Sequence, residues 1–382
     1  MHSTAPFAFD WQPRTRLIFG PDTLERVGDI ARDLEGKRAL LVTDAGIVKA
    51  GHAGRAVGFI AAAGLQVEVY DAVRENPSTA DVTECVTVAR KANVDILIGL
   101  GGGSSMDTAK GCNFILTNGG EMKDYWGVGK ATKPMLPLIA IPTTSGTGSE
   151  CQSAALIADE VTHQKMACLD PKAAARVAIL DPVLTLSQPA RVTACTGVDA
   201  IVHALEAAVT KKRNAISAIY AREAFRLCFL SLPRVLERPD DLEARARMLL
   251  GAAFAGTAIE NSMLGAAHSC ANPLTARHNV VHGQAVGLMI RGVMRFNAAL
   301  PEVEQVYRDL AADVGIGSVE ELIFAFDAIL EWAGLRGKLS EFGLSRDGIP
   351  LLAQEAAKQW TAQFNPRTIV SEDFARLFEE VL

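Results

Sequence analysis

The first half of the chain alternates short apolar runs with longer amphipathic stretches. The apolar runs are four to six residues long, most of them rich in β-branched residues and bounded by Gly, Pro, Asp or Asn, which is typical of buried strands. These runs are Arg16–Phe19, Ala39–Thr43, Val67–Tyr70, Asp95–Leu100, Leu136–Ile141 and Val177–Leu180. Helical patterns lie between them, at Gly51–Ala63, Ala80–Ala92 and Met106–Leu116. The alternation of strand, crossover helix and strand predicts an α/β domain with a mostly parallel sheet.

The pattern changes after Asp181-Pro182, because Ala-rich helical periodicity replaces the strand-like runs. The predicted helices are Gly197–Val209, Ala215–Phe229, Asp241–Ala258, Gly283–Asn297 and Glu302–Val314. Ser318-Val-Glu-Glu321 is the sequence of a capping box and predicts one more helix, which runs to Trp332. We therefore expect an α/β domain over residues 1–185 and an all-helical domain over residues 186–382.

Composition narrows the function classes. The chain has 382 residues, which suits two domains, and its net charge of −6 argues against a nucleic-acid partner. No apolar run approaches the length of a membrane span, and the N-terminus lacks the pattern of a secretory signal. The seven cysteines are scattered and never form C-x-x-C, which is typical of reduced thiols. We expect a cytoplasmic enzyme or binding protein without a membrane partner.

Three consecutive glycines, Gly101 to Gly103, join a predicted strand to a predicted helix. Glycine lets the backbone approach a ligand, and the free N–H groups of a helix start favour a phosphate. The spacing is not G-x-G-x-x-G, so the common dinucleotide fingerprint is not met. A tight turn without a ligand is the alternative interpretation.

A second loop, Pro142-Thr-Thr-Ser-Gly-Thr-Gly-Ser-Glu150, also follows a predicted strand and is rich in hydroxyls and glycine. Its alternative is a solvated surface loop. Two such turns at the carboxyl ends of parallel strands would share one edge of the sheet, where ligands bind. Asp44 also ends a strand, where a carboxylate accepts hydrogen bonds from ribose hydroxyls and repels a 2′-phosphate. The alternative is a structural one, since Asp at a strand end is also a common helix cap.

An acidic and histidine-rich pattern points to a metal. Asp199 and His203 are four residues apart on a predicted helix, so both side chains share a face and can reach one ion. With His268 and His282 they would form a mixed oxygen and nitrogen site suited to Fe²⁺, Zn²⁺, Mn²⁺ or Co²⁺. The alternative for each histidine is an ordinary hydrogen-bonded imidazole. For the remaining histidines we expect a surface position for His278 and no role for residues 52 and 163.

In combination these motifs resemble the iron-containing (group III) alcohol dehydrogenase family. The resemblance covers nearly the whole length, from the strand that ends at Asp44 to Asn365-Pro-Arg. It implies the dehydroquinate synthase-like fold: an α/β dinucleotide-binding domain, an all-α domain and an active site between them. It implies one divalent metal, with Fe²⁺ favoured and Zn²⁺ as the alternative, bound by Asp199, His203, His268 and His282. It further implies contacts with NAD(P) from Asp44, Asn76, Gly102, Gly103, Ser104, Asp107, Thr143, Thr144, Thr147 and Lys165.

The function that this resemblance implies is a metal-dependent, NAD(P)-linked oxidoreductase. It would interconvert a primary alcohol, diol or hydroxyaldehyde and the corresponding aldehyde or ketone by hydride transfer, as a homodimer or larger homo-oligomer. The charge of Asp44 favours NAD over NADP. Alternatives with the same fold are a polyol- or sugar-acid-specific dehydrogenase and a maleylacetate-reductase-like enzyme. An alternative of another class is a non-catalytic dinucleotide- or metal-binding sensor.

One position departs from the family pattern. Many members have His-Pro-Leu-Gly four residues after the third metal ligand, whereas this chain has Asn272-Pro-Leu-Thr275. An amide does not titrate near neutral pH, so Asn272 cannot relay a proton as a histidine would. Its side chain can still form a hydrogen bond with substrate or cofactor. Our hypothesis is that this substitution shifts the substrate preference or the pH optimum.

Overall fold

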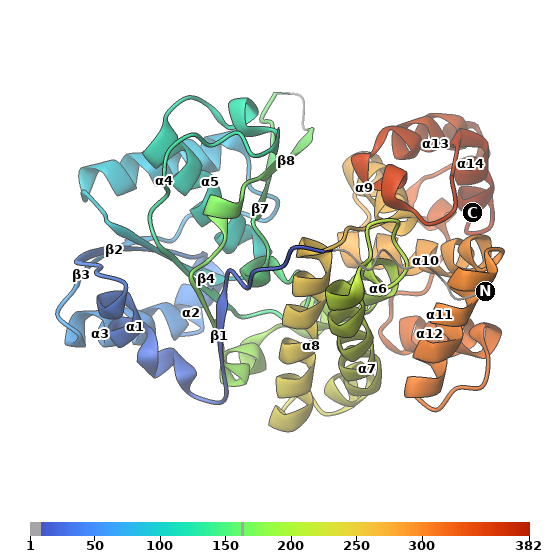
Figure 1. Cartoon of the computed structure of the whole chain (residues 1–382), viewed down its shortest axis with the longest axis horizontal. Helices are drawn as coiled ribbons and strands as arrows, with labels where there is room; N and C mark the ends of the chain where they lie inside the picture. The colour runs from blue at the N-terminus through green and yellow to red at the C-terminus, as the bar shows by residue number, and fades with distance from the viewer. Residues whose placement is uncertain (1–8, 162–163) are drawn as a thin grey trace. The chain divides into compact units, whose positions relative to one another are not determined.

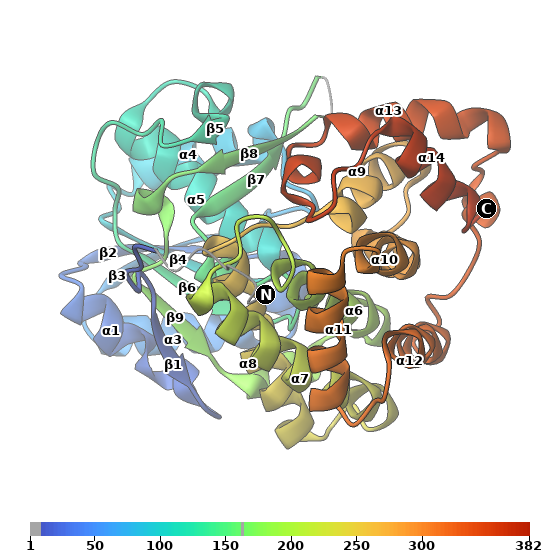
Figure 2. The same ribbon diagram turned by 45° about the vertical axis from the view of Figure 1, so that its right-hand side comes forward.

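The computed structural model describes residues 9–161 and 164–382 (Figures 1 and 2). The chain divides into two compact units, an α/β unit of residues 12–144 and 148–188 and a helical unit of residues 145–147 and 189–382, with residues 9–11. Among the described residues, the helical unit has one hydrophobic core and the α/β unit has two, one on each face of its large sheet. Within the described residues no helix combines the length and apolarity needed to cross a membrane.

The α/β unit contains a six-stranded sheet with the order β1-β9-β6-β4-β2-β3, in which every pairing is parallel. The strands are β1 (Arg16–Phe19), β2 (Arg38–Val42), β3 (Gln66–Tyr70), β4 (Ile96–Gly101), β6 (Leu138–Pro142) and β9 (Val177–Leu180). All six strands predicted from the apolar runs are present, and the parallel α/β fold class is confirmed.

Helices cover both faces of this sheet (Figure 1). They are α1 (Val27–Asp33), α2 (Ala45–Lys49), α3 (His52–Ala62), α4 (Thr79–Lys91) and α5 (Gly103–Asn118). Alternate strand residues enter different cores: Leu41 packs with α1 and α3, whereas Leu40 packs with α4 and α5. Burial on both faces explains why the strands read as continuous apolar runs and not as alternating patterns.

The direction in which successive strands are added to the sheet changes between β2 and β4. The chain passes from β2 to its neighbour β3 on one side, and then from β4 to β6 on the other side. The carboxyl ends of β2 and β4 therefore lie at a topological switch point, which is where open parallel sheets bind ligands. The segments after these strands carry Asp44 and the three consecutive glycines.

A small second sheet was not predicted. It consists of β5 (Gly127–Val128), β7 (Ala154–Ala158) and β8 (Lys165–Leu169), with β7 and β8 antiparallel. Its two longer strands are rich in Ala, Met and Leu, which favour helix, so the sequence lacks the β-branched signal. Their inner residues pack in the same core as α4 and α5, and this tertiary packing decides the conformation.

The helical unit contains no strand in residues 189–382, all of which the structure describes. Its helices are α6 (Ala190–Ala207), α7 (Ala215–Glu237), α8 (Leu242–Glu260), α9 (Ala266–His278), α10 (His282–Ala298), α11 (Pro301–Asp313), α12 (Val319–Trp332), α13 (Ile349–Lys358) and α14 (Ser371–Glu379). The all-α prediction for the second half is confirmed.

Several boundaries in this unit differ from the prediction. Helix α6 begins at Ala190 and not at Gly197. This glycine lies inside the helix, where an added Cβ would lie 2.4 Å from Leu232 Cδ1. Helix α9 was missed because Pro273 lies inside it and most of its side chains are buried, so no amphipathic pattern marks it. Helices α13 and α14 were also missed. Ser318 caps α12 as predicted, although the Glu321 carboxylate accepts the N–H of Gly317 instead of closing the capping box.

A buried lysine joins α5 to the hydroxyl-rich loop of the α/β unit. Lys110 is fully buried, and its Nζ donates hydrogen bonds to Ser149 O at 2.6 Å, Ser149 Oγ at 2.8 Å and Ala154 O at 2.9 Å. The Ser149 hydroxyl in turn donates to Asp107 Oδ1 at 2.7 Å, and this oxygen lies 4.0 Å from Lys110 Nζ. The ammonium group therefore compensates the buried carboxylate and fixes the loop.

Lys110→Met is expected to destabilise the protein by about 3–5 kcal/mol, because it leaves a buried carboxylate and two buried carbonyls without their cation. Denaturant unfolding, followed by a probe in the α/β unit, measures the change. The matched control is Lys123→Met, since Lys123 pairs with Glu121 on the surface, and we expect its unfolding midpoint to stay unchanged. Equal midpoints for both variants would contradict the prediction.

Candidate functional site

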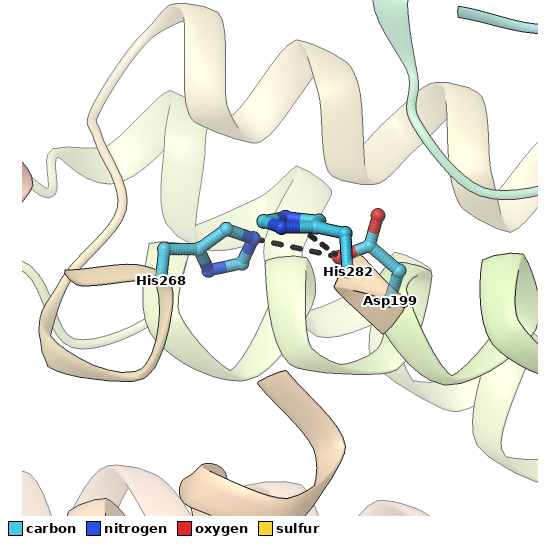
Figure 3. Close-up of side chains that lie close together, drawn as sticks. All are labelled: Asp199, His268 and His282. Atoms are coloured by element: carbon cyan, nitrogen blue, oxygen red, sulfur yellow. Dashed lines mark ion pairs between the residues drawn. The ribbon is translucent and has the colours of Figure 1, made fainter. Parts of the chain in front are cut away.

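An acidic residue and two histidines from three helices converge in the helical unit (Figure 3). Asp199 lies in the middle of α6, His268 in the first turn of α9, and His282 at the first position of α10. The His268 Nε2 is 3.5 Å and the His282 Nε2 is 3.9 Å from Asp199 Oδ1. Their ligand atoms all lie within 4.8 Å of one another, a spacing that one metal ion can span.

His203 approaches the same carboxylate from one turn further along α6. Its Nε2 is 3.4 Å from Asp199 Oδ1, and its ring stacks on His268 with centroids 4.8 Å apart. The group Asp199, His268 and His282 does not include His203. Even so, the Nε2 atoms of His203, His268 and His282 all face the same oxygen, Asp199 Oδ1. The structure thus brings together the four residues that the sequence singled out.

The chemistry of these atoms fits a divalent cation. Asp199 Oδ1 and His268 Nε2 are buried and have no hydrogen-bond partner, which is costly unless a ligand supplies one. Two ligands each ~2.1 Å from one ion lie ~3.0–3.5 Å apart at angles of roughly 90–110°. The distances from Asp199 Oδ1 to His203 and His268 are in this range, and the distance to His282 is slightly longer.

Electrostatics support the same interpretation. Burial alone would raise the pKa of Asp199, but His203 and the two other imidazoles hold it well below its usual range. Burial lowers the pKa of His203, which favours the neutral imidazole. Burial also lowers the pKa of His268, but the Asp199 and Glu206 carboxylates outweigh it and raise this pKa to about 9. The two carboxylates thus favour positive charge at this cluster.

Glycines allow the helices to come this close. An added Cβ at Gly283 would lie 2.0 Å from the carbonyl oxygen of Cys195, so only glycine lets α10 start against α6. This contact lies one turn before Asp199 on α6 and places His282 next to it. Gly146 has a similar role, because a Cβ there would lie 2.4 Å from Thr196 Cβ.

Two residues near the histidine rings had no predicted role. The Gly146 carbonyl accepts a hydrogen bond from His203 Nδ1 at 3.3 Å, and Glu206 Oε2 lies 2.6 Å from His268 Nδ1. Glu206 follows Asp199 by seven residues on α6 and shares its face, a spacing that the sequence does show. For Gly146 no local signal exists, because the contact depends on how a distant loop packs against α6.

The remaining histidines lie elsewhere. His278 is half-buried and bonds through Nδ1 to the Phe342 carbonyl, so the predicted surface position is only partly right. His52 is buried in the α/β unit, with Nε2 2.8 Å from Ser187 Oγ. Residues 2 and 163 are outside the described part of the chain.

The sheet edge of the α/β unit gathers most of the predicted NAD(P) contacts. Gly102 caps α5, and Gly103 and Ser104 form the first turn, whose N–H groups are available to a phosphate. Gly101 has a φ of +149°, and a Cβ there would lie 2.4 Å from Ser105 Oγ, so the turn requires glycine. Thr143, after β6, donates its N–H to Gly101 O at 2.9 Å, which places the hydroxyl-rich loop beside the glycine turn.

Asp44 combines both of its possible roles. Its Oδ1 caps α2 by accepting the N–H groups of Gly46 and Ile47 at 2.8 and 3.1 Å. Its Oδ2 lies toward the glycine turn, 3.3 Å from where a Cβ on Gly101 would be. The buried hydroxyls of Thr43 and Thr144, at the ends of β2 and β6, have no hydrogen-bond partner. These unpartnered hydroxyls at the sheet edge fit a polar ligand.

The other predicted contact residues are placed differently. Asp107 accepts hydrogen bonds inside the unit on both oxygens, from Ser149 and from the N–H of Leu156. Lys165 begins β8 and is exposed, and its charge acts on the buried Asp107. Asn76 is exposed in the loop after β3 with a φ of +53°. Thr147 belongs to the short loop segment that is grouped with the helical unit.

Asn272 is on α9, one turn after His268, and is half-buried. Its Nδ2 donates a hydrogen bond to Gln359 Oε1 at 2.9 Å. This contact fixes the orientation of the Asn272 amide. The amide oxygen, Oδ1, then points away from Gln359 and can accept a hydrogen bond. The position one turn from a candidate metal ligand is compatible with a contact to a bound substrate.

Comparison with known proteins identifies the chain. Residues 13–182 match the model "Iron-containing alcohol dehydrogenase", and residues 193–382 match "Fe-containing alcohol dehydrogenase family, C-terminal". The NAD-dependent methanol dehydrogenase of Bacillus methanolicus is 33% identical over 371 residues, 96% of this chain and 97% of its own.

Solved structures agree with these matches. A crystal structure of 1,3-propanediol oxidoreductase has a TM-score of 0.93 and 31% identity, covering 98% of this chain and 100% of its own. Sulfoacetaldehyde reductase from Bifidobacterium kashiwanohense, in complex with NAD⁺, has a TM-score of 0.90 and 28% identity, with 98% of each chain covered. The family models cover both halves of the sequence, and the predicted resemblance is confirmed: this chain belongs to the iron-containing alcohol dehydrogenase family.

Proposed function

We propose that this enzyme is a metal-dependent, NAD-linked oxidoreductase that interconverts an alcohol and its aldehyde or ketone by hydride transfer. The observation that carries this proposal is the buried Asp199 carboxylate. Its Oδ1 has no hydrogen-bond partner and faces the Nε2 atoms of three imidazoles. The dehydrogenase and reductase names of its relatives support the reaction class.

In this proposal Asp199, His203, His268 and His282 bind one divalent ion, Fe²⁺ by family and Zn²⁺ as the alternative. The ion would act as a Lewis acid on the alcohol or carbonyl oxygen of the substrate. Asp199 contributes the negative charge, and the buried, neutral His203 contributes a nitrogen lone pair whose direction is set by the Gly146 carbonyl. His282 keeps 31% of its side chain exposed, which leaves that side of the cluster open to a small molecule.

The sheet edge of the α/β unit is the proposed NAD site, and the cofactor supplies the hydride acceptor. The first turn of α5, from Gly102 to Ser104, would hold the pyrophosphate, with Thr143 and Thr144 as further donors. Asp44 Oδ2 would accept the ribose hydroxyls, since Oδ1 is already engaged in the cap of α2. Residues 1–185 and 186–382 would then be the nucleotide-binding and metal-binding domains.

Asn272 would hold the substrate without moving its proton, because an amide neither gains nor loses a proton near neutral pH. The substrate is a small alcohol or aldehyde. We also propose a cytoplasmic homodimer or larger homo-oligomer, as the family resemblance implies.

Metal removal tests the main proposal. Protein purified without oxygen is expected to hold about one divalent ion per chain and to lose NAD-linked alcohol turnover on chelation. Fe²⁺ or Zn²⁺ should restore the turnover, and neither should restore an Asp199→Asn variant, because it lacks the anionic ligand. Full turnover by metal-free protein would contradict the proposal and favour a maleylacetate-reductase-like enzyme. Metal and NAD binding without turnover on any alcohol would favour a sensor.

Asp44→Asn tests the nucleotide preference. Asparagine retains the helix cap and removes the charge, so stability should change little. A carboxylate ~4 Å from a 2′-phosphate is repelled by up to about 4 kcal/mol, so kcat/KM for NADP relative to NAD should rise at least about tenfold. Asp241→Asn, at the cap of α8, is the control for the loss of a capping charge. An unchanged NADP to NAD ratio would show that Asp44 does not face the ribose.

Asn272→His tests the position where the chain departs from the family. The imidazole adds a group with a pKa of about 6.5, so alcohol turnover should gain an ionisation there and decline at lower pH. Asn272→Gln retains the amide chemistry and should keep the original pH profile. If Asn272→His has both the pH–rate profile and the substrate ranking of the natural enzyme, the hypothesis for this position is wrong.

A further inference from the structure

We propose that Glu206 is a positioning residue that fixes the ring orientation and the tautomer of His268, and thereby sets the affinity of the metal centre. This inference rests on the proposed function, since it concerns how the centre binds its ion. Glu206 lies on α6, two turns after Asp199, and is 3% exposed. A buried carboxylate at this place needs donors to compensate its charge.

The donors are all supplied by the first turn of α9. Glu206 Oε1 accepts the N–H of Ala267 at 2.7 Å, and Oε2 accepts the N–H of Gly265 at 3.1 Å. The same Oε2 lies 2.6 Å from His268 Nδ1. One carboxylate therefore binds both the backbone of this helix turn and the imidazole ring that the turn carries.

This arrangement decides which ring nitrogen carries the proton. Both oxygens of Glu206 face backbone N–H groups, so the side chain acts as an acceptor in each direction. The short contact with His268 is then a hydrogen bond from Nδ1–H to the carboxylate. The lone pair of the neutral ring is consequently on Nε2, the atom that faces Asp199 Oδ1 and has no hydrogen-bond partner. A carboxylate on the far nitrogen also makes an imidazole a stronger metal ligand.

A second buried group, Asn365, also holds the start of α9, and its contact does not involve Glu206. Asn365 Oδ1 accepts the N–H of Ala266 at 3.3 Å, and Asn365 is held by paired amide hydrogen bonds with Asn297 at 3.0 and 2.7 Å. Gly265 leaves the necessary space, because an added Cβ would lie 3.1 Å from both Asn365 Oδ1 and Glu206 Oε1.

Glu206→Gln is the informative variant because it keeps the size of the side chain. Its NH₂ group must face either the Ala267 N–H or the His268 ring. In the first case two N–H donors face each other, and in the second the proton of His268 must move from Nδ1 to Nε2. We expect Zn²⁺ and Co²⁺ to bind 10- to 100-fold more weakly than to the natural protein, as measured by competition with a chromogenic chelator. The visible absorption of the Co²⁺ form should change as well, since one ligand moves.

Ser269→Ala is the matched control. Its hydroxyl is also buried in the first turns of α9, where it donates to Gly265 O at 2.9 Å and contacts Thr361 Oγ1, but it forms no hydrogen bond with the His268 ring. This variant should bind Zn²⁺ and Co²⁺ within about threefold of the natural protein. Equal loss of affinity in both variants would mean that any disturbance of the helix start has this effect, and would overturn the specific role of Glu206.

The outcomes separate this inference from the proposed function. If the natural protein binds neither ion, the metal-dependent function fails, whereas unchanged affinity in Glu206→Gln overturns only the role of Glu206. Should that variant not fold, ¹⁵N-histidine NMR of the Zn²⁺-loaded natural protein gives the answer. We expect a protonated Nδ1 and a Zn²⁺-bound Nε2 for His268, and an unprotonated Nδ1 would overturn the inference.

Discussion

The site in the helical unit depends on the buried carboxylate of Asp199. Asp199 is 6% exposed and sits in the middle of α6, where an ionised carboxylate is tolerated only with compensating positive charge or hydrogen-bond donors. Three imidazoles from α6, α9 and α10 face this carboxylate. Glu206 contacts one of them, the His268 ring, at its other nitrogen, Nδ1. Close approach of the helices is part of the same constraint, because Gly283 contacts the α6 backbone where no side chain fits.

The α/β unit meets a different requirement, which is to offer polar groups at the edge of an otherwise apolar sheet. Its strands are buried on both faces, so side chains with chemical function are confined to the segments that follow them. Those segments carry Asp44, the glycine turn and the two threonines after β6. Lys110 and Asp107 stabilise this edge, because their hydrogen bonds with Ser149 fix the loop that contains it. Asp107 thus supports the site from inside the unit, and its contact with the cofactor stays a prediction.

The hydroxyl-rich loop serves both units. Thr143 and Thr144 extend strand β6 at the sheet edge, whereas residues 145–147 belong to the helical unit, where the Gly146 carbonyl accepts the His203 ring N–H. A single stretch of chain thus contributes to the proposed nucleotide site and to the orientation of a proposed metal ligand. Its composition follows from this, since threonine supplies hydroxyl groups and glycine lets the backbone pack against Thr196.

The sequence alone determined the features that depend on short-range patterns: the six parallel strands, most of the helices, and the pairing of Asp199 with His203 across one helical turn. The sequence also marked His268 and His282 as candidate ligands, but not how their rings reach Asp199. The contacts of Glu206 with α9, of Gly146 with His203 and of Gly283 with α6 join residues far apart in the chain, so only tertiary packing decided them. The same holds for β7 and β8, whose Ala- and Met-rich strands pair because of the core beneath them, and for α9, which is buried too completely to show a periodic pattern. Local propensity acts within a few residues, whereas the orientation of each metal-facing ring depends on helices that meet only after folding.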